Sequence, residues 1–535
     1  TGNQNTAVGR SALMDNTTGS NNTAVGMNAL ERNTTADGNT AVGYYALIQN
    51  TTGNLNTAVG SNTLENNTIG DANTAMGNSA LNSNTEGNYN TALGNNTLSA
   101  NTTGGANTAV GSSALSANTT GARNTVIGSG AYDNADTESD NLAIGYYALG
   151  GSIAGGEYNV AIGNNSLDAN TSGDYNVGLG YNALTGNTTG ANNTAIGTST
   201  LRYNTTGELN TAVGRGALFS NTTGDKNTAI GVYSLGNNTT GENNTVLGYS
   251  ALTSNTTGDH NTAVGNNSMY DNTTGESNTA IGYDALKNNE TGNSNTTIGF
   301  QSLYTNTTGS SNTAHGHKAL ERSTTASNNT AHGHKSLQLN TTGSNNTSLG
   351  NSAGDVITTG SQNVIIGSGS DPSSNSASNQ TVIGYGATGQ ADNSVVLGNA
   401  SVTAVYMAQD KGATAYGATF DASTAVKTPL IEYTDGDDAI TIADGGGVTA
   451  NAGLAVKNGA TSAGGVSFYE DSDNGTNYMK LQAGAMGSDV TLTLPTADGS
   501  SGQFLSTDGS GTLSWGSSSV GASEIDDLSD GLIED

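Results

Sequence analysis

The chain has 535 residues and a net charge of −30, only 33% of it is hydrophobic, and 77 residues are glycine. So little apolar mass excludes a thick globular core, and the charge argues against nucleic acid or anionic lipid as a partner, because both need a positive face. No apolar run is long enough for membrane insertion, and the absence of cysteine excludes disulfides and thiolate metal sites.

A 17-residue repeat fills the first three quarters of the chain and reads Asn-Thr-Ala-Val-Gly-x-x-Ala-Leu-x-x-Asn-Thr-Thr-Gly-x-x. Its first glycine, which we call the marker glycine, recurs every 17 residues from Gly9 to Gly145 and from Gly163 to Gly384. One step of 18 residues joins the two runs, and a last step of 14 residues reaches Gly398, which makes 24 turns.

The length of the repeat decides the fold class. Helical repeats need about 33 residues or more, whereas 17 residues can hold two short strands and two turns. No proline precedes Pro372, as expected where every N–H joins a ladder. The sequence therefore predicts an all-β fold with a parallel β-solenoid, or β-roll, over residues 1–400. The 18-residue step near Gly151–Gly156 predicts a bulge in an otherwise continuous stack.

Each repeated position has a predicted role. The residue before the marker glycine is Val, Ile, Leu or Met in 22 of the 24 turns, and a leucine commonly stands four residues after that glycine. We expect both to point inward as apolar anchors. The Asn-Thr-Thr-Gly segment should form a corner with residues that tolerate positive φ. Asparagines four residues before the marker glycine should share amide hydrogen bonds as a ladder. In the first four turns this structural ladder comprises Asn5, Asn22, Asn39 and Asn56, with Gly9, Gly26, Gly43 and Gly60.

The strand segments resemble a known family. Asn141–Gly145 and Ser394–Gly398 are similar to the Ser-Val-Ala-Ile-Gly motif in the head repeat of trimeric autotransporter adhesins, although the repeat of that family is shorter. The longer form with Asn-Thr-Thr-Gly is similar to repeats in tail fibres of tailed phages. The resemblance covers about residues 1–400 and implies a trimeric, left-handed parallel β-roll, and thus a homotrimer of this chain.

The last quarter of the chain lacks the repeat. Residues 401–535 hold 19 acidic and 4 basic residues, and we divide them into a β-rich shaft or connector at 401–465 and a β-rich fibre module with an open acidic tail at 466–535. Asp508-Gly509 predicts a turn. The stretch from Phe468 to Trp515 resembles a module of phage fibre proteins. Alternating residues predict strands at 439–442 and 489–494.

Four of the five histidines occur in two adjacent turns, at His315, His317, His332 and His334. His315 and His332 replace the apolar residue before the marker glycine, and a strand would place both histidines of a turn on one face. If that face points at a threefold axis, three chains bring six imidazoles to each turn, a set suited to Fe, Ni, Co or Zn. The pattern resembles His-x-His metal sites in the long tail fibre of T-even phages.

The alternative for these histidines is a duplicated repeat with solvated side chains. The sequence leaves open whether the histidine face points to a trimer axis, to the interior of its own coil or to solvent. The choice decides whether a metal binds.

The patterns predict a structural and adhesive fibre and not an enzyme, because no catalytic constellation or phosphate-binding loop stands out. We expect an extracellular, trimeric phage tail fibre on the virion, which contacts other virion proteins and a host cell-surface receptor, with a glycan among the candidates. The alternative is a trimeric adhesin on a bacterial cell surface, or an extracellular filament subunit, which contacts cell-envelope proteins. An ice-binding solenoid is disfavoured because adjacent threonines such as Thr17 and Thr18 diverge.

Overall fold

The structure is a computed structural model that describes residues 1–151, 156–403, 405, 465–469, 478–482, 494–508, 510 and 512–517. The chain divides into two units, Thr1–Ala413 and Thr414–Asp535. The strands predicted at 439–442 and, up to residue 493, at 489–494 lie outside the described residues, as does the acidic tail after residue 517.

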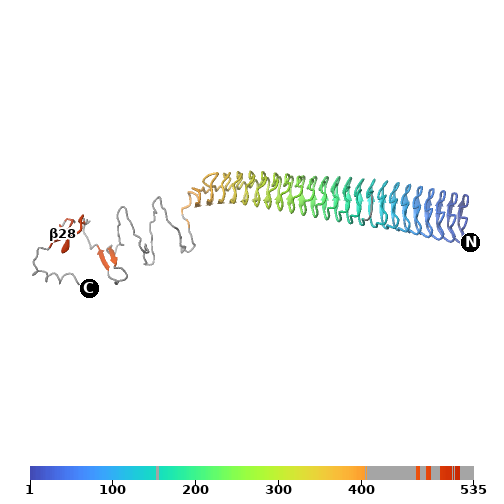
Figure 1. The fold of residues 1–535 in the computed structure, drawn as a ribbon, viewed down its shortest axis with the longest axis horizontal. Coiled ribbons are helices and arrows are strands. Elements are labelled where there is room, and N and C mark those ends of the chain that lie inside the picture. The colour runs from blue at the N-terminus through green and yellow to red at the C-terminus, as the bar shows by residue number, and fades with distance from the viewer. Residues whose placement is uncertain are drawn as a thin grey trace. The chain divides into compact units, whose positions relative to one another are not determined.

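The first unit is a parallel β-solenoid, which confirms the predicted fold class (Figure 1). All its strands belong to one sheet, and each pairs in parallel with the strands of the turns before and after it, so that Thr23 lies between Thr6 and Thr40. The 24 strands are β1 (Thr6–Val8), β2 (Thr23–Val25), β3 (Thr40–Val42), β4 (Thr57–Val59), β5 (Thr74–Met76), β6 (Thr91–Leu93), β7 (Thr108–Val110), β8 (Thr125–Ile127), β9 (Leu142–Ile144), β10 (Val160–Ile162), β11 (Val177–Leu179), β12 (Thr194–Ile196), β13 (Thr211–Val213), β14 (Thr228–Ile230), β15 (Thr245–Leu247), β16 (Thr262–Val264), β17 (Thr279–Ile281), β18 (Thr296–Ile298), β19 (Thr313–His315), β20 (Thr330–His332), β21 (Thr347–Leu349), β22 (Val364–Ile366), β23 (Thr381–Ile383) and β24 (Val395–Leu397).

Each turn contains one strand, so the prediction of two strands per turn is wrong. The backbone bends sharply after the strand, with positive φ at Gly43 (144°), Tyr45 (57°) and Leu47 (52°) in the third turn. Such alternating left-handed residues prevent an extended segment. The backbone still bonds from turn to turn, since the Leu30 amide donates to the carbonyl of Ala46 at 3.0 Å. The stack is therefore held by ladders well beyond its strands.

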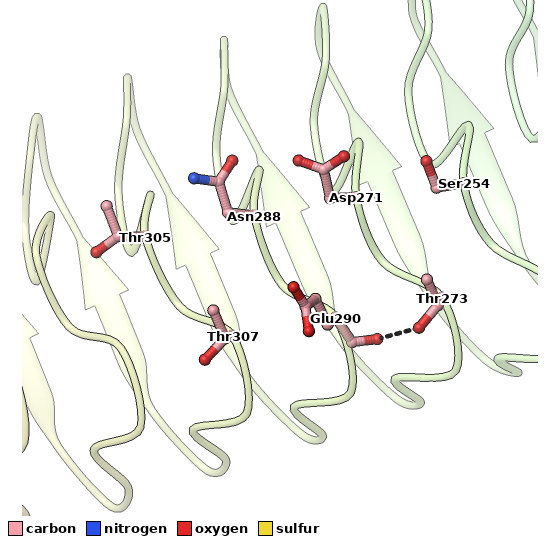
Figure 2. Close-up of a pocket in the computed structure, with 7 residues that line it drawn as sticks. All are labelled: Ser254, Asp271, Thr273, Asn288, Glu290, Thr305 and Thr307. Atoms are coloured by element: carbon pink, nitrogen blue, oxygen red, sulfur yellow. Dashed lines mark hydrogen bonds between the residues drawn. The ribbon is translucent and has the colours of Figure 1, made fainter.

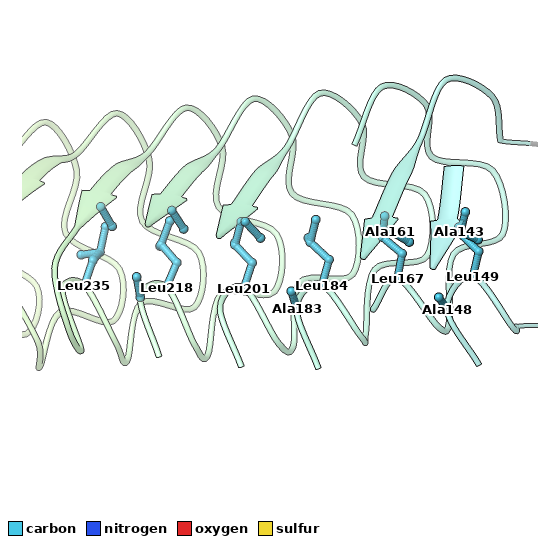
Figure 3. Packing of buried hydrophobic residues seen from close by; sticks show 14 of the residues in the cluster. Ala143, Ala148, Leu149, Ala161, Leu167, Ala183, Leu184, Leu201, Leu218 and Leu235 are labelled. Atoms are coloured by element: carbon cyan, nitrogen blue, oxygen red, sulfur yellow. The ribbon is translucent and has the colours of Figure 1, made fainter. Parts of the chain in front are cut away.

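The core of the coil is thin and consists chiefly of alanine and leucine columns (Figure 3). Ala24, in the middle of a strand, and Leu30, four residues after the marker glycine, are fully buried. The predicted inward leucine is therefore confirmed. The other predicted anchor is wrong, because Leu247 before its marker glycine is 48% exposed. Successive strand residues face opposite sides, so a buried central alanine forces its two neighbours outward.

The asparagine column that starts at Asn5 is a buried hydrogen-bonded ladder. The backbone amide of Asn39 donates to Oδ1 of Asn22 at 2.8 Å, and Nδ2 of Asn39 donates to the carbonyl of Gly53 at 2.8 Å. A second ladder lies at the corner, where Nδ2 of Asn50 donates to Oδ1 of Asn33 at 3.1 Å and also to the carbonyl of Gly53 at 2.9 Å. Two amide columns thus satisfy most of the buried polar side chains, although Oδ1 of Asn118, Asn306 and Asn340 has no partner.

Two glycine columns are required for different reasons. Marker Gly26 has a φ of +138°, and a Cβ there would lie 2.2 Å from the carbonyl oxygen of Gly43. Corner Gly53 has no positive φ, contrary to the prediction for this segment. A Cβ at Gly53 would instead lie 2.4 Å from the carbonyl oxygen of Gly70 and 2.6 Å from Oδ1 of Asn50. The corner glycine therefore allows close stacking beside the amide ladder.

The stack continues across the 18-residue step, as predicted. Strand β10 pairs in parallel with β9, and Val160 lies opposite Leu142. The bulge predicted near Gly151–Gly156 falls on residues 152–155, which lie outside the described part of the chain. The longer step therefore leaves the register of the sheet intact.

The second unit contains two antiparallel hairpins within its described residues. Strand β25 (Gly465–Tyr469) pairs with β26 (Tyr478–Gln482), and β27 (Gln503–Thr507) pairs with β28 (Leu513–Ser517). The predicted turn at Asp508 is present, because its Oδ1 accepts from the backbone amides of Ser510 and Thr512 at 2.8 and 3.1 Å. Across the residues that the structure describes, no helix is long and apolar enough to cross a membrane.

Candidate functional site

An apolar stripe follows the outward face of the solenoid sheet. It is formed by the third residue of each strand and by the residue after each marker glycine where that residue is apolar. The members that are clearly exposed are Val8, Met27, Tyr44, Met76, Ile127, Tyr146, Leu179, Tyr181, Ile196, Ile230, Leu247, Tyr249, Ile281, Tyr283, Phe300, Leu349, Ile383, Tyr385 and Leu397. Apolar patches of this extent on a protein surface mark interaction sites.

Sequence reasoning missed this stripe because it assigned the third strand residue to the interior. The signal was available in the motif Thr-Ala-Val. Its first and third residues share one face, and a column of threonine is a poor core. The small central alanine, such as Ala229 between Thr228 and Ile230, is the residue that fits a narrow coil.

An aromatic ladder lies on the stripe, in the column directly after the marker glycine. The ring centroids of Tyr283 and Phe300 are 5.5 Å apart, those of Phe300 and His317 are 5.1 Å apart, and those of His317 and His334 are 5.0 Å apart. Interplanar angles of 10–14° show that the rings stack on one another along the rod. The faces are therefore occupied within the chain, and ring edges remain for outside contacts.

The four histidines form two separate exposed columns. His315 and His332 end strands β19 and β20, and their ring centroids are 4.6 Å apart at 65°. His317 and His334 lie beyond the strands, after a marker glycine with strongly positive φ, as Gly316 shows at +141°. The strand alternation invoked in the sequence argument therefore does not extend to the second histidine of each turn.

The exposed histidines exclude one of the three orientations that the sequence left open. All four side chains are exposed on the single chain, so the histidine face does not point into its own coil. In the described residues of one chain, no group of three or more His, Cys, Asp or Glu side chains could hold a metal ion. A nitrogen-rich metal site here would need histidines from further chains.

One half-buried acidic residue stands where the repeat usually has a core leucine. Asp371 stands four residues after Gly367, where the repeat usually has its inward leucine. Burial, together with the neighbouring carboxylate of Asp355, raises the pKa of Asp371 to about 6. Its Oδ1 has no hydrogen-bond partner.

The chain was compared with known protein families and curated proteins, and it matches no family model and no curated sequence.

Proposed function

We propose that the chain is a structural, non-enzymatic fibre protein that assembles as a homotrimer along the apolar stripe and serves as an extracellular attachment fibre of a tailed phage. The observation that carries this proposal is the stripe itself, which repeats once per turn over the length of the solenoid. An apolar surface of this length is stabilised by association, because association removes it from water.

A second copy of the chain fits the stripe better than an unrelated partner does. The stripe has a constant period of one turn, and another copy supplies the same period over the same length. The third residue of each solenoid strand is Val, Ile, Leu, Met or His, so packing along this column buries no carboxylate. The charge of −30 per chain then stays on the other faces, where salt screens it.

The assignment to a phage rests on the resemblance of the region from Phe468 to Trp515 to a module of phage fibre proteins. It implies a virion tail location, contacts with other virion proteins and attachment to a host cell-surface receptor. A bacterial cell-surface adhesin or an extracellular filament subunit would use the same rod and is the alternative.

The trimer would give the histidines a role. His315 and His332 belong to the column of the stripe, so three chains packed along it would bring their imidazoles together. His317 and His334 stack on each other in the neighbouring exposed column. We therefore include a transition metal (Fe, Ni, Co or Zn) on the trimer axis, held by the four histidines of each chain. Such a metal would lock the three chains in register.

Light scattering tests the assembly. The chain should have three times its mass of 53.3 kDa in solution. Charged substitutions on the stripe, Ile230→Glu with Leu247→Glu, should give a monomer with an unchanged circular dichroism spectrum, because both side chains lie outside the coil. The matched control Thr240→Glu, at an exposed corner, should remain trimeric. A wild-type chain that is a folded monomer would overturn the proposal.

A further inference from the structure

A polar groove crosses four turns of the solenoid between β15 and β19. Ser254, Asp271, Asn288 and Thr305 line one side, and Thr273, Glu290 and Thr307 line the other, around a volume of about 480 Å³ (Figure 2). All seven residues come from the segments between strands, on the loops of successive turns. The groove therefore shares no residue with the apolar stripe.

The sequence at this groove departs from the repeat at one corner position. Glu290 occupies the first threonine position of the corner, which among the described turns from residue 17 to residue 358 is otherwise threonine except at Asp136. The threonine has a structural task, since the Thr273 hydroxyl donates to the carbonyl of Glu290 at 2.9 Å. Glu290 has no hydroxyl for the corresponding bond to Thr307. An exposed carboxylate has thus replaced a stack-forming contact at this turn.

A column of aromatic and basic side chains comes directly before the residues of one side of the groove in the sequence. Tyr270, Lys287 and Tyr304 occupy one column in three successive turns, directly before Asp271, Asn288 and Thr305 in the chain. The Lys287 Nζ lies 5.6 Å from the Tyr304 ring centroid and 3.9 Å from Asp284 Oδ1. Lys287 is therefore held in place beside an aromatic ring. A second hollow of about 370 Å³ lies against this column, lined by Tyr249, Ser250, Asn267, Tyr270 and Lys287.

The lining suits a polyhydroxylated ligand. Asp271 and Glu290 offer strong acceptors, while Asn288 and the threonine hydroxyls can both donate and accept. The Tyr270 ring lines the second hollow instead. Burial raises the pKa of Asp271, although Lys287 acts in the opposite direction. This carboxylate is therefore partly shielded from water, where a hydrogen bond to a ligand gains in strength.

Charge and spacing narrow the class of ligand. The groove is lined by two carboxylates, and Lys287 of the second hollow is already near Asp284, on a chain with a charge of −30. Anionic ligands such as sialylated or sulfated glycans would be repelled. The same positions recur once per turn, about 4.8 Å apart. An extended sugar chain that lies along the rod would meet a similar set of side chains at each residue.

We propose that this groove binds a neutral oligosaccharide, which makes it a receptor-contact site on the flank of the fibre; the inference rests on the proposed attachment function. Asp271 and Glu290 accept hydrogen bonds from sugar hydroxyls, and Asn288 and Thr305 fix the orientation of the sugar.

Glycan binding by the full chain tests the proposal. The probes are immobilised neutral tetrasaccharides of hexose and of N-acetylhexosamine, with sialylated and sulfated tetrasaccharides for comparison. The test variant combines Asp271→Ser with Glu290→Thr, which are residues that neighbouring turns carry at the same positions and which therefore fit the fold. The matched control is Asp136→Thr, an acid-to-threonine change in the same column outside the groove.

We expect the wild-type chain to bind a neutral probe and the double variant to bind it at least about tenfold more weakly, since two hydrogen bonds to charged acceptors are lost. Asp136→Thr should bind as the wild type does. Binding to no neutral probe, binding to anionic probes alone, or equal binding by the double variant would each overturn the inference.

Light scattering on the same samples separates this inference from the proposed assembly. If a monomeric chain binds the neutral sugar through the groove, the sugar-binding inference is supported and the proposed trimer is refuted. If the chain is a trimer that binds no neutral sugar, the sugar-binding inference is refuted and the proposed trimer is supported.

Discussion

Replacement of Asn244 by alanine tests whether the buried amide ladder holds the solenoid together. Asn244 is fully buried, and its side chain makes three hydrogen bonds. Its Oδ1 accepts from the Asn261 amide at 2.9 Å, and its Nδ2 donates to the Gly258 carbonyl at 2.9 Å and to Asn227 Oδ1 at 3.1 Å. Alanine removes all three bonds and puts no polar group in their place.

The expected cost follows from what each partner retains. The carbonyl of Gly258 still accepts from Nδ2 of Asn255, and Asn227 Oδ1 still accepts from the backbone amide of residue 244. The buried amide of Asn261 loses the side-chain acceptor. An orphaned buried donor costs about 1–3 kcal/mol, and each of the other two bonds contributes about 1 kcal/mol. Asn244→Ala should therefore lower the free energy of unfolding by about 3–5 kcal/mol.

Guanidinium unfolding measures the total effect, and hydrogen exchange locates it. Because each turn contacts chiefly its neighbours, the loss of protection should centre on β14 to β16 and fade over the next turns. The control is Asn237→Ala, an exposed asparagine in the preceding turn, which should change stability by no more than about 0.5 kcal/mol. Equal stability of the two variants would refute the assignment of a structural role to the ladder.

Three further predictions concern the marker glycine, the acidic core position and the histidines. Gly248→Ala should lower the free energy of unfolding in guanidinium by more than about 2 kcal/mol, because φ is +150° and the new Cβ would lie 2.2 Å from a backbone oxygen. The control Gly236→Ala, whose Cβ would be 3.2 Å from its nearest atom, should lower it less. Asp371, with a pKa raised to about 6, is less readily ionised in the folded chain than in the unfolded chain, so its contribution to stability should increase as the pH falls from 7 towards 4. Asp371→Asn should remove this gain. Thermal melting at several pH values measures it, and an equal gain in the wild type and in Asp371→Asn would show that the reasoning is wrong. Elemental analysis of the purified trimer, never exposed to chelator, should find about one transition-metal ion per histidine-bearing turn, and His317→Asn should lower that content; a metal-free trimer would rule out the proposed axial site.

The constant repeat period predicted most of the fold. Once the turn length was constant, residues 17 apart had to be neighbours, so the parallel stack, the 24 turns and the asparagine ladder from Asn5 onward could be predicted without a structure. The same 17-residue repeat places Asp371 at a leucine position and shows that Glu290 replaces a threonine. Both signals were present in the sequence, and neither was used.

The path of the chain within one turn could not be predicted in the same way. A 17-residue length permits two strands, but positive φ at core leucines such as Leu47 bends the backbone and leaves one strand. Side-chain identity does not indicate this conformation, because a left-handed leucine is unfavourable in isolation. Tertiary packing of the buried leucine column and the ladder bonds between turns stabilise it.

The sequence by itself therefore determined the class of fold, the number and register of the turns and the columns in which side chains stack, because a fixed period makes these properties one-dimensional. Only the tertiary structure decided which face of each strand is inside. Alternation requires Thr228 and Ile230 to share a face, but the closure of the coil by residues outside the strand determines that this face points outward. That single choice changes the predicted core column into an exposed apolar stripe and decides that the histidines lie on the surface of the coil, which the sequence left open.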